Sequence, residues 1–118
     1  MSNSAQRSLA AGSIAEAAPV FAALGDATRL RIVAQLCRGG PASISRLTES
    51  AAVSRQAVTK HLRALEDAGL VCSDRTGRER IWELQTRRLA QVRRYLDQIS
   101  GQWDNTLQRL AAFVEREE

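Results

Sequence analysis

Four polar side chains in the segment 54–71 have the types and the spacing to contact DNA. They recur at intervals of three, one and three positions, as Gln56, Thr59, Lys60 and Arg63. Amide, hydroxyl and cationic groups can hydrogen-bond to base edges or phosphates, and the major groove is wide enough to admit a helix. Since a helix advances about 100° per residue, all four side chains would share one face. The segment predicts a DNA-recognition helix, although these residues alone also fit an ordinary solvated face.

The same segment carries an apolar stripe on the other side of the predicted helix. Val58, Leu62 and Leu65 form this stripe and would pack inward. Ser54 is suited to the N-cap, because its hydroxyl can accept a hydrogen bond from a backbone N–H of the first turn. Gly69 marks the end of the helix. One face would therefore pack while the other is free to bind.

A shorter helix precedes the recognition helix, and a hairpin follows it. Apolar residues at 44, 47 and 51 precede a break at Ala52-Val53, which is helix-turn-helix spacing. Two β-rich runs, VCSDR and ERIWEL, flank Gly77, so a tight hairpin is expected there. Arg75, Arg78 and Arg80 make this hairpin basic, as in a wing that follows a phosphate backbone or enters a minor groove. A plain surface hairpin is the alternative.

Two further helices are predicted before the helix-turn-helix, over residues 14–24 and 27–38. Pro19 favours a regular first helix that begins only around Ala18, because proline fits best near a helix start. Asp26 is the expected N-cap of the second helix. The predicted inward stripe of this helix is Leu30, Val33 and Leu36.

The final segment repeats apolar residues every three or four positions over about seven helical turns. Such a stripe is too long to bury on a small domain, so it predicts pairing with a second copy of the chain. Packing against the first helix of the same chain is the alternative, and Gly101 could bend or divide the helix. The expected dimer interface comprises Phe21, Leu24, Leu96, Ile99, Trp103, Leu107 and Leu110.

Charge is distributed unevenly along the 118 residues. Residues 27–63 hold seven basic side chains and the single acid Glu49, a balance of +6, whereas residues 97–118 carry −3. A basic segment adds sequence-independent affinity for DNA by releasing counterions, so binding should weaken steeply with salt.

Other function classes have little support in the sequence. An enzyme is not expected, because there is one histidine, no glycine-rich phosphate loop and no nucleophile with a base nearby. The first dozen residues are polar and no later run could span a bilayer, so a cytoplasmic protein without membrane partners is expected. Cys37 and Cys72 are expected to be free thiols.

Three stretches, FAALGDATRLRIVAQL, SRQAVTKHLRALEDAGLV and GRERIWEL, resemble the ArsR family of bacterial winged-helix repressors. The resemblance covers about Val20 to Leu84 and implies a homodimer whose recognition helices block transcription at a palindromic operator. Carried onto this chain, the reading residues would be Ser54, Arg55, Gln56, Thr59 and Lys60, with Arg78 at the wing. Together with the basic residues found above, the predicted DNA-binding set is Ser54, Arg55, Gln56, Thr59, Lys60, Arg63, Arg78 and Arg80.

The metal sites of many ArsR proteins have no counterpart here. Ser43 and Ser45 stand where the resemblance would place a Cys-x-Cys, and hydroxyls are poor ligands for soft metals. His61 is the only histidine and lies in the recognition helix. The terminal WDNTLQRLAAFVE resembles a metal-independent branch of the family, so no metal or cofactor is expected and the effector is open. A thiol-responsive repressor using Cys37 and Cys72, or a protein-interaction winged helix, remain alternatives.

The sequence thus predicts a mainly α fold with a small β-hairpin: a winged helix-turn-helix with a long terminal helix for dimerisation. The expected organisation is a flexible N-terminal arm over 1–13, a DNA-binding domain over 14–85 and a dimerisation helix over 86–118.

Overall fold

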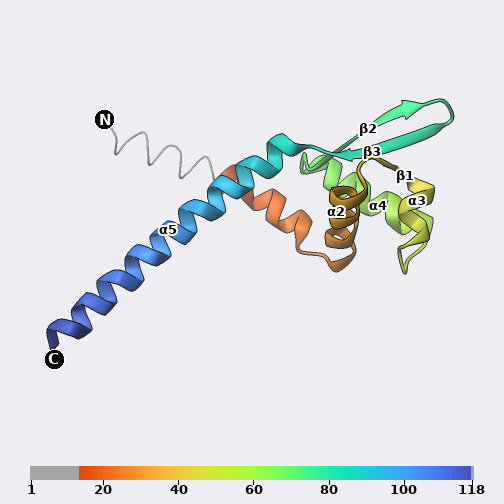
Figure 1. Cartoon of the computed structure of the whole chain (residues 1–118). Helices are drawn as coiled ribbons and strands as arrows, with labels where there is room; N and C mark the ends of the chain where they lie inside the picture. The colour runs from red at the N-terminus through yellow and green to blue at the C-terminus, as the bar shows by residue number, and fades with distance from the viewer. Residues whose placement is uncertain (1–13, 118) are drawn as a thin grey trace.

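The computed structural model describes residues 14–117, with side chains to residue 116. The predicted flexible arm over 1–13 lies outside the described residues. A first helix covers residues 14–24. It is followed by α2 (Ala27–Gly39), β1 (Ala42–Ser43), α3 (Ile44–Glu49), α4 (Arg55–Asp67), β2 (Val71–Thr76), β3 (Glu79–Leu84) and α5 (Thr86–Glu117). The fold is mainly α with a small antiparallel sheet, which confirms the predicted winged helix-turn-helix class (Figure 1).

Helices α2, α3 and α4 each begin at a side chain that caps them. Asp26, Ser43 and Ser54 all have extended backbones and accept a hydrogen bond from the backbone N–H three residues on. The distances are 3.1 Å for Asp26, 3.3 Å for Ser43 and 3.2 Å for Ser54. These caps satisfy donors that have no partner inside the helix, and they confirm the predicted starts of α2 and α4.

Helix α4, the predicted recognition helix, ends at a paired turn built around Gly69. The N–H of Leu70 donates to the carbonyl of Leu65, and the N–H of Gly69 donates to the carbonyl of Glu66, both at 2.9 Å. This is the Schellman arrangement, which needs a left-handed residue. Gly69 supplies it with φ +77°. The chain therefore turns directly from α4 into β2.

The predicted wing is present, and it belongs to a sheet of three strands. β2 and β3 pair from Val71 opposite Leu84 to Thr76 opposite Glu79, which leaves Gly77 and Arg78 as a two-residue turn. Gly77 has φ +66°, as a glycine first in such a turn can adopt. The third strand, β1, pairs with β3 and was not predicted, because two residues show no periodicity.

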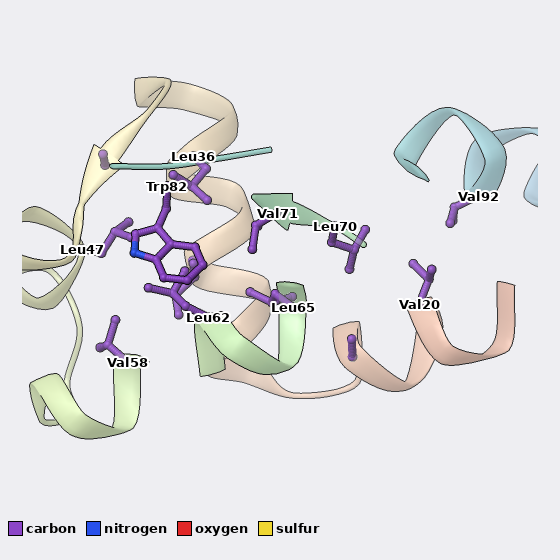
Figure 2. Close-up of a cluster of buried hydrophobic side chains, with 13 residues drawn as sticks. Val20, Leu36, Leu47, Val58, Leu62, Leu65, Leu70, Val71, Trp82 and Val92 are labelled. Carbon is purple, nitrogen blue, oxygen red and sulfur yellow. The ribbon is translucent and has the colours of Figure 1, made fainter. Parts of the chain in front are cut away.

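The core lies where α2, α3 and α4 meet the sheet. The predicted inward stripe of α4, Val58, Leu62 and Leu65, is fully buried. Trp82 of β3 reaches into the same cluster beside these residues (Figure 2). Val53, directly before the cap of α4, packs partly buried against the core, which helps to fix how α3 and α4 meet.

The predicted inward stripe of α2 was partly wrong. Leu36 is buried and Val33 is half-buried, but Leu30 is 51% exposed. Ile32 occupies the core instead, at 2% exposure. By the helical advance of about 100° per residue, Leu30 lies roughly 160° from Ile32, so a helix with apolar residues on both sides can bury only one set.

The first helix is regular through Pro19, which corrects the expected start near Ala18. Proline removes one backbone hydrogen bond, and the exposed position of Pro19 on the outer side of the helix lets the ring sit in solvent. The inner side packs on α5. Val20 points toward Val92 of α5 (Figure 2), and the rings of Phe21 and Tyr95 lie 6.1 Å apart.

Helix α5 is one continuous element of 32 residues, so Gly101 does not divide it. A Cβ at Gly101 would meet nothing within 4 Å. The first half of α5 packs beside the first helix, and the second half extends away from the other helices and the sheet (Figure 1), giving the molecule extents of 67 × 35 × 20 Å. Within the described residues, no helix combines the length and the apolar character that crossing a membrane requires.

Candidate nucleic-acid interface

The outer face of α4 carries the polar residues that the sequence predicted for DNA contact. Gln56, Lys60 and Arg63 are exposed, and Thr59 is half-buried. Val58, Leu62 and Leu65 anchor the opposite face in the core, so the polar side chains have a rigid support. The structure therefore brings the predicted reading side chains of α4 together on one solvent-facing surface.

The N-terminal end of α4 carries two more predicted DNA-contacting residues, Ser54 and Arg55, and a hydrogen bond to Arg55 orients Thr59. Ser54 uses its hydroxyl oxygen to accept from the N–H of Ala57, so the residue closes the helix end as well as being exposed. Thr59 donates its hydroxyl proton to the carbonyl of Arg55 at 2.9 Å. The Thr59 oxygen is thereby left as an acceptor, and its methyl group is available for apolar contact. Arg55 is exposed beside Ser54.

The wing places three exposed arginines at its outer end. Arg78 lies in the turn, and Arg75 is directly opposite Arg80 in the strand register. Like charges that face each other across a hairpin destabilise it by a few tenths of a kcal/mol to about 1 kcal/mol. Arg80 is held by donating from Nη1 to the Ser73 hydroxyl at 2.9 Å. Such a concentration of positive charge is suited to a polyanion.

A polar node behind α4 positions the recognition helix, and sequence reasoning missed it. The Nε of Arg29 donates to Nδ1 of His61 at 3.2 Å, and Nη1 donates to the Ala23 carbonyl at 3.3 Å. Arg29 thus joins the end of the first helix, the start of α2 and the middle of α4. Only its place beside a predicted cap, Asp26, could have suggested this role.

Asp26 completes this node. Its Oδ2 lies 3.8 Å from Nδ1 of His61, a contact that becomes an ion pair only when the imidazole is protonated. The hydrogen bond from the backbone N–H of Arg29, with smaller contributions from the charges of His61 and Arg29, holds the pKa of Asp26 below its usual value. His61 therefore has a structural setting, with its Nδ1 accepting from Arg29.

The two cysteines lie in different environments. Cys37 is exposed near the end of α2. Cys72, on β2, donates from its thiol to Oε1 of Glu83 at 3.7 Å. Burial, together with the charge of Glu83 and this hydrogen bond, raises the pKa of the Cys72 thiol. Because the thiolate is the reactive form, these surroundings do not activate Cys72.

Metal ligands are not clustered in the part of the chain that the structure describes: no three His, Cys, Asp or Glu side chains gather there to hold an ion. Ser43, in the position where the resemblance would place a thiolate, is the N-cap of α3. Its oxygen accepts from the N–H of Arg46.

The predicted dimer residues form a second candidate surface. Five of them lie on α5 with exposed fractions between 41% and 65%, namely Leu96, Ile99, Trp103, Leu107 and Leu110. Phe113 and Val114, exposed at 60% and 57%, extend the same stripe. Phe21 is 36% exposed, whereas Leu24 is half-buried and packs against its own core. We call the seven α5 residues 96, 99, 103, 107, 110, 113 and 114 the α5 stripe.

Comparison with known proteins identifies this architecture. A helix-turn-helix domain model matches residues 24–72. The HTH-type transcriptional regulator Rv2034 of Mycobacterium tuberculosis is 37% identical over 95 residues, which cover 80% of this chain and 85% of that protein. The structure of an ArsR-like transcriptional regulator from Rhodococcus sp. RHA1 superposes with a TM-score of 0.75 at 41% identity, over 86% of this chain and 95% of that one.

A third similarity concerns the fold. The homodimeric winged helix-turn-helix DNA-binding domain of Mb0332 from Mycobacterium bovis, described as a possible ArsR-family regulator, has a TM-score of 0.61 at 22% identity, over 78% of this chain and 83% of that one. The winged helix-turn-helix fold and the identity to Rv2034 and to the Rhodococcus protein indicate the same family. The chain belongs to the ArsR family of winged helix-turn-helix transcriptional regulators, which are DNA-binding proteins.

Proposed function

We propose that this regulator is a repressor that binds a palindromic operator as a homodimer, without sensing a metal. The observation that carries the proposal is the outer face of α4, where a basic and amide-bearing surface is exposed on a helix whose other face is fully buried. In this proposal residues 14–85 form the DNA-binding domain, and residues 86–118 form the dimerisation segment.

The proposed reading mode places α4 in the major groove. Gln56 can donate and accept on one base edge, and Thr59 offers an acceptor and a methyl group, so these two residues would give sequence preference. Lys60 and Arg63 would contact phosphates or guanine. The predicted contacts at the helix start are Ser54 and Arg55, and those at the wing are Arg78 and Arg80, with Arg75 added by its register opposite Arg80.

Dimerisation is proposed from the α5 stripe. Its seven exposed apolar side chains follow helical spacing, and exposed apolar patches of this kind mark interaction surfaces. Pairing two copies along α5 would bury the stripe and give a two-fold axis. The winged-helix domain from Mycobacterium bovis, which shares the fold, is described as homodimeric. A two-fold pair of recognition helices matches two half-sites about one helical turn apart.

Repression follows from occupying the operator, because a bound dimer excludes polymerase from overlapping DNA. Metal independence is proposed from the chemistry of Ser43 and Ser45, whose hydroxyls are poor ligands for the soft metals that thiolates bind. The cap that Ser43 forms on α3 gives this residue a structural role instead.

The test is selection of bound fragments from genomic DNA with the purified full chain, followed by gel-shift titration of the selected site. Gln56→Ala and Thr59→Ala should weaken specific binding more than binding to shuffled DNA, by about 1–3 kcal/mol per base contact. Lys60→Ala should weaken both equally, and Gln102→Ala on α5 is the matched control. Equal losses on both DNAs for all the α4 variants would contradict the assigned reading residues, and binding that zinc abolishes would contradict metal independence.

A further inference from the structure

A cleft runs between the first helix and α5 and continues to the point where α4 turns into β2. It consists of two adjoining cavities of about 270 Å³ and about 610 Å³ that share Glu16, Arg88 and Gln91 as lining residues. The smaller cavity has an apolar floor formed by Ala17, Val20 and Val92, all of which are buried. A cavity with an apolar floor and a few convergent polar groups is typical of a small-molecule site.

Arg88 is the central polar residue of this cleft. It is half-buried, and its Nη1 donates to Oε1 of Gln91 at 3.2 Å. Its guanidinium lies against Gly69, where an added Cβ would come within 2.9 Å of Nε. Among the described residues, no carboxylate lies within 4 Å of Arg88. A half-buried guanidinium that is positioned by an amide and has no carboxylate within 4 Å favours an anion with two parallel acceptor oxygens.

The shape and charge of the smaller cavity narrow the ligand class. Arg88 and Arg94 outnumber its single acid, the exposed Glu16, so an anionic group is favoured there. A volume of about 270 Å³ lies close to the lower end of ligand pockets, which begin at about 300 Å³. It therefore fits a compact molecule with an apolar body and one carboxylate.

The cleft borders the surface proposed for dimerisation. Gln91, Arg94 and Gln98 line it and share one face of α5, since they are spaced by three and four residues. At about 100° per residue, the centre of this face lies roughly 140° around the helix from that of the α5 stripe, whereas Arg88 and Val92 lie within roughly 50° of the stripe centre. Pairing along the stripe therefore leaves open the side of the cleft that Gln91, Arg94 and Gln98 form.

The larger cavity connects this site to the recognition helix. Glu66 is in the last turn of α4, and Gly69 forms the turn that ends it. The Arg88 guanidinium lies beside Gly69, so a ligand that engages it would act next to the turn that ends α4. A ligand that binds one orientation of α4 more tightly than another would shift the chain toward that orientation and so change its affinity for DNA.

From this placement we propose that the cleft binds a small organic carboxylate, with its apolar body against Ala17, Val20 and Val92 and its carboxylate paired with Arg88. Its occupancy changes the affinity of the dimer for the operator. The second statement rests on the proposed function; the first does not.

The binding test is calorimetric titration of the full-length chain with phenylacetate and with phenylacetamide, which has the same size and no charge. Phenylacetate should bind saturably, and phenylacetamide at least about tenfold more weakly, because a charge-assisted hydrogen bond is lost. Arg88→Gln should weaken phenylacetate binding by about tenfold or more, while Arg93→Gln, exposed on α5 and outside both cavities, should leave it unchanged. Equal affinity for the acid and the amide, or equal weakening in both variants, would overturn the site.

A second variant separates ligand loss from misfolding. Ala17→Leu should fill the floor of the smaller cavity and weaken binding, and thermal unfolding identifies any variant that is not folded. If Ala17→Leu is folded and binds phenylacetate as tightly as the natural chain, the ligand does not lie on this floor and the proposal is wrong.

The regulatory step is tested by gel shift of the selected operator with and without phenylacetate. A changed operator affinity that is lost in Arg88→Gln supports the coupling. An operator complex that is indifferent to bound phenylacetate overturns the coupling while leaving the proposed function intact. Failure of the ligand-free chain to form any specific complex overturns the proposed function, and the calorimetric result then decides the site by itself.

Discussion

Trp103 gives the sharpest test of dimerisation, because it is the most exposed of the large apolar residues on α5. It is 65% exposed, so of a side-chain surface of about 250 Å², roughly 160 Å² is open to a partner. If a second copy covers half of that area, burial contributes about 2 kcal/mol per protomer at about 25 cal/mol per Å². Both copies lose this contribution in Trp103→Ala, which amounts to about 4 kcal/mol and a rise in the dimer Kd of roughly a thousandfold.

Sedimentation equilibrium over a dilution series measures this Kd directly. Asn105→Ala is the matched control, since Asn105 is exposed on α5 about 160° around the helix from Trp103. Circular dichroism should show the same helix content in both variants, because neither side chain is part of the core. A dimer Kd for Trp103→Ala within threefold of the control would refute the reasoning, as would a natural chain that stays monomeric.

Three other perturbations test the wing, the backbone and the cap. Arg75→Thr should weaken binding to all DNA sequences and lower the salt slope by about one in anisotropy titrations, while the free energy of unfolding stays equal or rises by up to about 1 kcal/mol as the like-charge pair is removed. In urea unfolding, Gly69→Ala should destabilise the fold by at least about 1–2 kcal/mol, because the φ of Gly69 is +77° and an added Cβ would come close to Arg88. Gly101→Ala should stabilise the fold by about 0.5–1 kcal/mol, because Gly101 lies inside α5 with nothing near an added Cβ. The opposite signs would contradict the backbone assignments. The pKa of Asp26 is lowered in the folded chain, so its charge stabilises the fold at pH values above the usual aspartate pKa. This contribution disappears as the pH falls through the folded pKa, so the difference in unfolding free energy between the natural chain and Asp26→Asn should shrink in acid. A difference that stays constant from neutral to acidic pH would rule this out.

Local signals in the sequence predicted most of the fold. Ser54 and Gly69 mark the ends of α4 through chemistry that acts within a few residues, and the structure has both features. Gly77 likewise indicated the wing turn. Features that depend on contacts between distant residues could not be predicted from the local sequence pattern. The strand β1 exists only through its pairing with β3, and the choice of Ile32 over Leu30 for the core depends on which neighbours cover α2.

The candidate site shows the same division. The outer face of α4 was predictable, because its polar residues share a helical face by spacing alone. The node that Arg29 forms with His61 was not, since the two residues are 32 positions apart and meet only after α2 packs on α4. The cleft around Arg88 combines the first helix, α4, β2 and α5, so no single stretch of sequence outlines it.

The most direct test of the central proposal is an anisotropy titration of the selected operator, the same duplex with one half-site scrambled, and a shuffled duplex, at about 50 mM and 200 mM salt. The proposal predicts two protomers per operator, an affinity at least about a thousandfold above that for shuffled DNA, and a large loss when one half-site is scrambled. Saturation by one protomer, or affinities for operator and shuffled DNA within about tenfold of each other, would contradict a homodimer that reads a palindrome.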